Sequence, residues 1–164
     1  MLTIGITGHQ HFEGISDTSW LKRELFTRMA ELENIALGYS SLAIGADVFF
    51  VEALLAMKIK MVAVIPCMNY DSTFSDSDLT LYQFLLNKAN DKIILDFSHP
   101  DQEAFFEAGK YIAEYSNILF VLWDGDQAKG LGGTGDVFDY ALKQNKAIIH
   151  INPWTEQTII YNEN

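Results

Sequence analysis

Residues 118–137 read ILFVLWDGDQAKGLGGTGDV, and this stretch decides the fold. Its first six residues form the most hydrophobic run of the chain, as expected of a fully buried strand. Four glycines between positions 130 and 135 then lead straight into an amphipathic segment. A buried strand, a glycine-rich turn and a helix make up one βα unit of an α/β fold, with the turn at the carboxyl end of the strand.

The rest of the chain repeats this alternation of short apolar runs and longer stretches of helical period. Parallel strands joined by helices need both faces of the sheet covered. The sequence therefore predicts an α/β, three-layer Rossmann-like fold with a mainly parallel, doubly wound sheet. One domain is expected over residues 1–151, followed by a polar C-terminal tail at 152–164. Strands are predicted at 2–7, 35–43, 61–65, 92–97, 118–123 and 146–151, and helices at 17–33, 45–57, 79–89, 101–115 and 134–144.

Composition narrows the classes of function. The chain has 164 residues with 11 Lys and Arg against 22 Asp and Glu, a formal net charge of -11. Duplex binding normally needs a basic face, so no nucleic acid partner is expected. One Cys excludes a disulfide framework and a Cys-based zinc cluster. With no signal-peptide pattern and no apolar run near the roughly 18 residues that span a membrane, we expect a cytoplasmic protein without a membrane partner.

The glycine-rich turn after residue 123 carries the strongest functional signal. Backbone N–H groups of Gly132, Gly133, Thr134 and Gly135 at a helix N-terminus suit a phosphate or another anionic group. The alternative is an ordinary loop that ends in a Thr N-cap. The pattern is neither a Walker A loop nor a dinucleotide fingerprint, which disfavours kinase and hydride-transfer chemistry and predicts no cofactor.

A second turn, with Thr7, Gly8 and His9, follows the first predicted strand. Gly8 permits a tight turn, and the three residues stand where a ligand meets the carboxyl end of a strand. Ligand contact and a plain polar loop remain equally open here. No acidic or Cys partner stands at a metal-ligand spacing from His9 or His11, so no metal site is predicted.

Three aspartates also stand at the carboxyl ends of predicted strands. Asp47 follows Gly45 in the first turn of a helix, where it either complements the helix dipole or orients a ribose hydroxyl. Asp124 and Asp126 follow the most hydrophobic strand and would contact ribose, a metal or water.

Residues 113–125 and 130–137, together with 5–9 and 45–47, resemble the SLOG superfamily. This superfamily groups the DNA-processing protein DprA, the cytokinin-activating LOG enzymes and YpsA-like proteins, and the resemblance covers residues 1–151. It implies a Rossmann-like fold that binds nucleotides or their derivatives, and a homodimer. Four phenylalanines would supply a helix interface or belong to the core: Phe49, Phe50, Phe105 and Phe106.

The resemblance to LOG enzymes also implies an enzymatic activity. These enzymes cleave the N-glycosidic bond of a nucleoside monophosphate, with the signature Pro-Gly-Gly-x-Gly-Thr-x-x-Glu. The glycines match at 131–139, but Leu131, Asp136 and Asp139 replace Pro, Thr and Glu. The Arg that LOG enzymes place on the preceding helix corresponds to Lys110, which lacks the planar fork of Arg.

Two functional hypotheses follow. In the first, a sensor or carrier binds a nucleotide-like molecule through the glycine-rich turn, with Asp136 capping the helix or turned away from the phosphate. In the second, the protein is a nucleoside 5'-monophosphate phosphoribohydrolase, with Asp139 as the first candidate carboxylate, Asp124 and Asp47 behind it, and Lys110 steadying the phosphate. The departures from the LOG signature favour binding and leave enzymatic turnover open.

Overall fold

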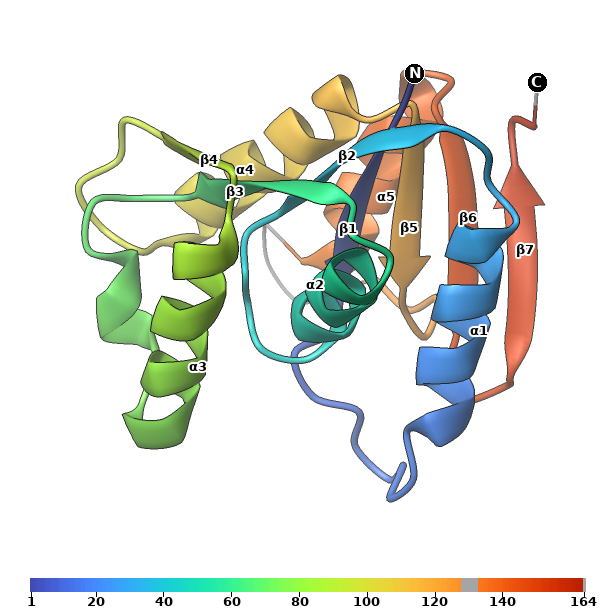
Figure 1. Cartoon of the computed structure of the whole chain (residues 1–164), viewed down its shortest axis with the longest axis horizontal. Helices are drawn as coiled ribbons and strands as arrows, with labels where there is room; N and C mark the ends of the chain where they lie inside the picture. Colours follow the sequence, from blue (N-terminus) through green and yellow to red (C-terminus); the bar gives the residue numbers. More distant parts are fainter. Residues whose placement is uncertain (128–132, 164) are drawn as a thin grey trace.

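The computed structural model describes residues 1–127 and 133–163, which form a seven-stranded sheet covered by helices (Figure 1). The strand order is β4-β3-β2-β1-β5-β6-β7. The strands are β1 Leu2–Gly8, β2 Ile35–Ser40, β3 Lys60–Ile65, β4 Asp91–Ile94, β5 Ile118–Leu122, β6 Ala147–Asn152 and β7 Gln157–Tyr161. The helices are α1 Ser19–Ala30, α2 Ala46–Ala56, the 3-10 turn η1 Tyr70–Thr73, α3 Asp76–Lys88, α4 Gln102–Tyr115 and α5 Thr134–Lys143.

The chain winds in both directions from the central strand β1. It moves outward on one side through β2, β3 and β4, and then crosses back to β5 and β6 on the other side. β1 pairs in parallel with both β2 and β5, and only β7 runs antiparallel to its neighbour among the described strands. The predicted α/β class with a mainly parallel, doubly wound sheet is therefore confirmed.

Two helical layers enclose the sheet. Helices α1 and α2 cover the face turned toward the viewer in Figure 1, and α4 and α5 lie behind the sheet. Ile4 and Ile6 of β1 join the core under α1 and α2, while Leu119 and Val121 of β5 join the core under α4 and α5. Alternate residues of buried strands thus feed two separate apolar layers, as period-2 side-chain geometry requires.

The four phenylalanines considered for a helix interface all contribute to packing within the chain. Phe50 is fully buried in the core. Phe49 and Phe105 are partly buried against the first core layer, and Phe106 packs against the second.

The segment predicted as a polar C-terminal tail contains a strand that the sequence analysis did not predict. Residues 157–161 form β7, which pairs with every residue of β6 from Ile148 to Asn152. Tyr161 packs against Phe138 of α5 with ring centroids 5.2 Å apart. Polar residues dominate the segment as a whole and obscure the short apolar run that makes the strand.

None of the helices among the described residues is long and apolar enough to cross a membrane.

Candidate functional site

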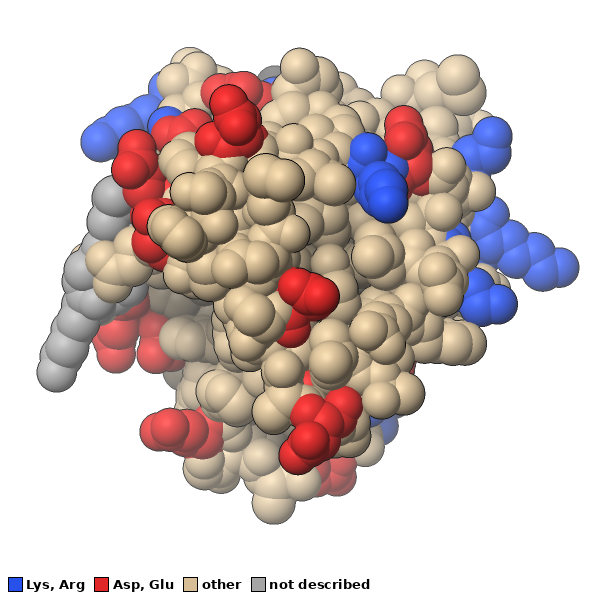
Figure 2. Space-filling model, turned by 90° about the vertical axis from the view of Figure 1, so that its left-hand side faces the viewer, with Lys and Arg blue, Asp and Glu red and all other residues tan. Residues whose placement is uncertain are grey.

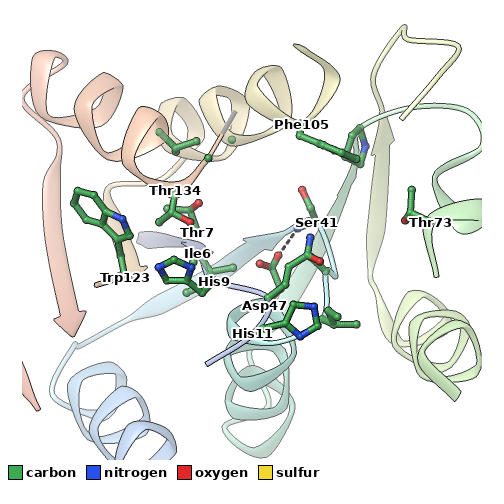
Figure 3. Close-up of a pocket in the computed structure, with 18 of the residues that line it drawn as sticks. Ile6, Thr7, His9, His11, Ser41, Asp47, Thr73, Phe105, Trp123 and Thr134 are labelled. Carbon is green, nitrogen blue, oxygen red and sulfur yellow. Dashed lines mark hydrogen bonds between the residues drawn. The ribbon is translucent and has the colours of Figure 1, made fainter. Parts of the chain in front are cut away.

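A cleft of about 790 Å³ opens at the carboxyl ends of β1, β2, β3 and β5. Figure 3 shows its walls, with Thr7, Thr134 and Trp123 on one side and Phe105 and Thr73 on the other. The cleft includes the place between β1 and β5 where the chain reverses its direction of winding. In open α/β sheets ligands bind at such a switch point.

The turn after β1 is fixed to both neighbouring elements. The backbone N–H of His9 donates to Leu122 O at 3.0 Å, and the N–H of Ala46 donates to His9 O at 3.0 Å. A Cβ on Gly8 would lie 2.5 Å from the Cβ of Ala46, so only glycine fits between the sheet and α2. Thr7, Gly8 and His9 all line the cleft, at the place where the sequence predicts ligand contact.

His9 faces Asp124 across the cleft floor. Its Nε2 lies 3.4 Å from Asp124 Oδ1 and 3.4 Å from the backbone nitrogen of Asp124. The ring nitrogen donates to the carboxylate when it carries a proton and accepts from the N–H when it does not. About a third of each side chain is exposed, 31% for His9 and 32% for Asp124, so both remain open to a ligand.

The turn between β2 and α2 is built around a buried carboxylate. Gly45 has φ of +80°, and a Cβ there would lie 2.4 Å from Gln10 O. Asp47 Oδ2 accepts from Ser40 Oγ at 2.7 Å and from the Ser41 N–H at 3.0 Å, and only 6% of the residue is exposed. Burial raises the pKa of Asp47 to about 6 against the lowering effect of these hydrogen bonds. Asp47 lines the cleft, whereas Gly45 supports the wall from behind.

The segment after β5 carries two further carboxylates of the cleft. Asp124 Oδ1 accepts from the Asp126 N–H at 2.8 Å, and Asn152 Nδ2 donates to Asp124 O at 3.1 Å. Trp123 Nε1 donates to Asp126 O at 2.9 Å. Asp124 and Asp126 therefore stand in a defined turn at the cleft mouth, where their carboxylates can accept further hydrogen bonds from solvent or ligand.

Helix α5 begins at the cleft. Gly133 is its N-cap residue, and Gly133 and Thr134 line the cavity. Gly135 is buried against Trp123, where a Cβ would lie 3.0 Å from the indole ring, so it serves packing rather than the cleft lining. Asp136 lies in the first turn of the helix and is not among the lining residues. Gly132 lies outside the described residues.

Two of the candidate catalytic residues do not line the cleft. Lys110 pairs with Glu107 on α4, and its Nζ lies over the rings of Phe106 and Tyr140. It lines a separate cavity of about 360 Å³. Asp139 accepts a long, 3.5 Å hydrogen bond from Gln127 Nε2. Of the four candidates, the structure therefore brings Asp124 and Asp47 to the cleft, but neither Asp139 nor Lys110.

Sequence reasoning missed the wall opposite α5. This wall comes from the loop after β3, η1, the start of α3 and the first half of α4, and its lining residues include Tyr70, Thr73, Phe74, Ser75, Asp78 and Phe105. The carboxyl-end rule points to the loop after residue 65, but nothing in its Asp- and Ser-rich sequence singles out the aromatic residues as lining. Tyr70 is buried among Phe74, Tyr82 and Phe105, and that burial raises the pKa of its hydroxyl.

The cleft carries negative charge. Its described lining includes Asp47, Asp78, Asp124 and Asp126 and contains no Lys or Arg. Figure 2 shows acidic side chains at the upper left, the centre and the lower part of one face, while most of the basic side chains on this face lie toward its right-hand side. Among residues 1–127 and 133–163, no cluster of three or more His, Cys, Asp or Glu side chains is arranged to hold a metal ion.

No protein family and no curated protein matches the chain in sequence. Solved structures of other proteins share its fold, and two of them are DprA proteins. DNA processing protein A (DprA) from Streptococcus pneumoniae matches with a TM-score of 0.65 and 18% identity, over 91% of this chain and 50% of that one. DprA from Helicobacter pylori matches with a TM-score of 0.63 and 20% identity, over 91% of this chain and 64% of that one. The chain thus spans 50% and 64% of these two proteins. The likeness shows a shared fold, which agrees with the Rossmann-like fold that the SLOG resemblance implies.

The prediction that the protein has no nucleic acid partner is contradicted by one of these structures. The Helicobacter pylori protein, which has this fold, is described with a single-stranded DNA binding mode. A net charge of -11 opposes duplex binding through a basic face. The net charge does not exclude the binding of single-stranded nucleic acid by a protein with this fold.

Proposed function

We propose that the cleft binds a nucleotide or a nucleotide-derived small molecule, and that the protein serves as a sensor or carrier of this ligand. One observation carries the proposal: a cavity of about 790 Å³ lies at the switch point of a doubly wound sheet, and the N-terminus of α5 opens onto it. Pockets for small molecules commonly measure about 300–1,000 Å³.

The anionic end of the ligand fits the α5 side. Thr134 begins a helix of ten residues and Gly133 is its N-cap, and both line the cleft. The first N–H groups and the dipole of this helix favour a negative group. Thr7 lies near Thr134 in Figure 3 and adds a second hydroxyl to this wall. Because Gly133 has no side chain, a phosphate can approach the backbone closely.

The ribose fits the cleft floor. Asp124 is partly exposed, and its carboxylate is a strong acceptor for vicinal hydroxyl groups. His9 stands beside it with a ring nitrogen that can donate or accept. Asp47 is a weaker candidate for ribose contact, since its Oδ2 is already bonded to Ser40 and Ser41.

The base fits the aromatic wall opposite α5. Phe74 and Phe105 line the cleft and are only partly buried, so ring surface remains for contact with a base. In Figure 3, Phe105 lies across the cleft from Trp123 and Thr134. The proposed base site and the proposed phosphate site are therefore on opposite sides of the cleft.

The charge of the lining favours a ligand with little negative charge. Four aspartates and no described Lys or Arg surround the cavity. A single phosphate held by backbone N–H groups is compatible with this field, whereas a free triphosphate is repelled. We therefore expect nucleosides and nucleoside monophosphates to bind more tightly than nucleoside triphosphates.

The same geometry supports binding without turnover. Phosphoribohydrolase chemistry as implied by the LOG resemblance needs a carboxylate and a cation next to the ligand. Asp124 supplies a carboxylate, but the described lining of the cleft contains no Lys or Arg. Lys110 lies outside it and is engaged by Glu107, and Asp139 also lies outside it.

A second candidate ligand is a nucleotide within single-stranded DNA. The fold likeness to the Helicobacter pylori protein favours it. The acidic lining disfavours a long phosphate backbone along the cleft. In this case a single nucleotide of the strand would enter the cavity and its neighbours would remain outside.

The test is a thermal-shift and calorimetric titration with adenosine, AMP, ATP and a short single-stranded oligonucleotide, repeated with the other bases. Binding to the folded state must raise the unfolding midpoint. We expect AMP-type ligands to raise it most and Thr134→Val to weaken them about fivefold through loss of one hydrogen bond. Thr80→Val, in α3 and outside the lining, is the matched control.

Three results would change the conclusion. No shift with any nucleoside or nucleotide and none with the oligonucleotide would overturn nucleotide binding altogether. A shift with the oligonucleotide alone would favour the second ligand. Release of free base on incubation, detected by chromatography and lost in Asp139→Asn, would show that the protein is a phosphoribohydrolase and would overturn the sensor or carrier function.

A further inference from the structure

The two edges of the sheet differ in how well they are protected against pairing with a strand of another chain. β4 and β7 end the strand order, so each has an outer backbone edge that pairs with no strand of the described chain. β4 has four residues and carries Asp91 and Lys92, charges of the kind that blunt an edge. β7 has five residues, from Gln157 to Tyr161, with no charge and no proline.

β7 also exposes apolar surface next to its open edge. Ile159 is 45% exposed and Ile160 is 44% exposed, and these neighbours point to opposite faces of the sheet. The ladder between β6 and β7 is continuous, without the bulge that would turn an edge away. A regular, uncharged, β-branched edge strand is a template for another strand.

Charge decides which strand can pair with it. A chain of net charge -11 repels its own copy, so self-association is least opposed where charge is absent. Glu24 of α1 accepts from Thr158 Oγ1 of β7 at 2.8 Å. The same carboxylate pairs with Arg28 at 2.7 Å, and Arg28 also pairs with Glu31 at 3.2 Å. β7 itself therefore carries no charged side chain, in a chain whose net charge is -11.

The sequence of β7 is compatible with pairing to itself. An antiparallel pair centred on Ile159 sets Ile159 opposite its own copy, Thr158 opposite Ile160 and Gln157 opposite Tyr161. In that register Glu156 faces Asn162 and Glu163 faces Thr155, so no two carboxylates meet. We propose that β7 pairs antiparallel with β7 of a second copy of this chain and joins the two sheets into one.

The experiment compares one substitution at the two edges. Ile159→Lys sets two ammonium groups against each other across the two-fold axis, whereas Ile94→Lys places the same charge on β4, where Ile94 is 53% exposed. By sedimentation velocity over a micromolar concentration series, we expect the wild-type chain and Ile94→Lys to reach twice the chain mass of 18.5 kDa, and Ile159→Lys to stay at that mass. A monomeric wild type, or an Ile159→Lys dimer, would overturn the proposal.

A second measurement does not depend on tolerance of lysine. Directly opposite residues of an antiparallel pair lie within disulfide reach. The single native thiol, Cys67, is buried, so an introduced cysteine is the one that reacts. Under mild oxidation Ile159→Cys should form a covalent dimer on a non-reducing gel and Ile94→Cys should not. Equal cross-linking of both variants, or of neither, would contradict the β7 pair.

Discussion

Asp47 and Asp124 both follow a buried strand and both line the cleft, but their surroundings differ sharply. Asp47 is 6% exposed, and Ser40 and Ser41 both donate to its Oδ2. The side chain of Asp124 is 32% exposed, accepts one N–H from Asp126 and faces His9. The first carboxylate is occupied in holding a turn, whereas the second is available to a ligand.

One cleft thus contains carboxylates of two kinds. A buried carboxylate with several donors shapes the backbone and is destabilised in its charged form. An exposed carboxylate stays in contact with solvent, and its interactions contribute little to the free energy of unfolding. Mutations at the two positions should therefore separate stability from binding.

The largest expected effect is on stability. Asp47→Ala removes the acceptor of the Ser40 hydroxyl and the Ser41 N–H and leaves both donors unpaired. We expect the free energy of unfolding to fall by about 3–4 kcal/mol, and by about 1 kcal/mol or less for Asp124→Ala. Urea denaturation at pH 5 measures both. Equal losses would show that the two aspartates do not differ in structural role.

The next effect is on the pH dependence of stability. The pKa of Asp47 is raised from 3.8 to about 6 by burial, so the folded state binds more protons than the unfolded chain between about pH 4 and pH 6. The contribution of Asp47 is present below about pH 4 and is lost as pH rises through about 6, a change of about 3 kcal/mol.

Asp47→Asn removes this titration. The difference in free energy of unfolding between wild type and Asp47→Asn should therefore shift in favour of the variant as pH rises from about 4 to about 7. Asp124→Asn provides the comparison at an exposed site. A wild-type curve parallel to that of Asp47→Asn across this range would contradict a raised pKa at Asp47.

The smallest effect is on ligand affinity. Asp124→Asn replaces a charged acceptor by a neutral one, so we expect adenosine to bind about tenfold more weakly. AMP should lose less, because the substitution also relieves repulsion of its phosphate. Calorimetry with both ligands measures the difference, and Asp71→Asn, in η1 and outside the lining, is the control. Identical losses for adenosine and AMP would argue against Asp124 as the ribose contact.

Most of the fold could be predicted from periodicity and turn residues. The apolar runs at 61–65 and 118–122 have the length and composition of buried strands, and each helix between strands shows an apolar face or an overall apolar character. The stretch at 157–161 could not be placed, because an edge strand with both faces partly exposed lacks the alternation that marks a half-buried one. β7 forms because it pairs with β6, and its own sequence pattern does not indicate a strand.

The site could be predicted only in part. The turns after β1 and β5 could be located because glycine at the end of an apolar strand marks a tight turn or a close approach of the backbone. The roles of Asp47 and Asp124 could not be told apart, since burial depends on how closely α2 packs against the turn after β1. The aromatic wall escaped prediction because Phe74 and Phe105 are far apart in sequence and come together only through η1 and α4.

The contact between Trp154 and His9 gives the molecule its own optical probe. The indole of Trp154 meets the His9 ring edge-on, with centroids 5.2 Å apart, and its Nε1 donates to Glu13 O at 2.8 Å. Trp123 lines the cleft itself, and Trp154 contacts the lining residue His9, so two of the three tryptophans report on this region. Occupancy of the cleft can therefore be followed through tryptophan emission without a label.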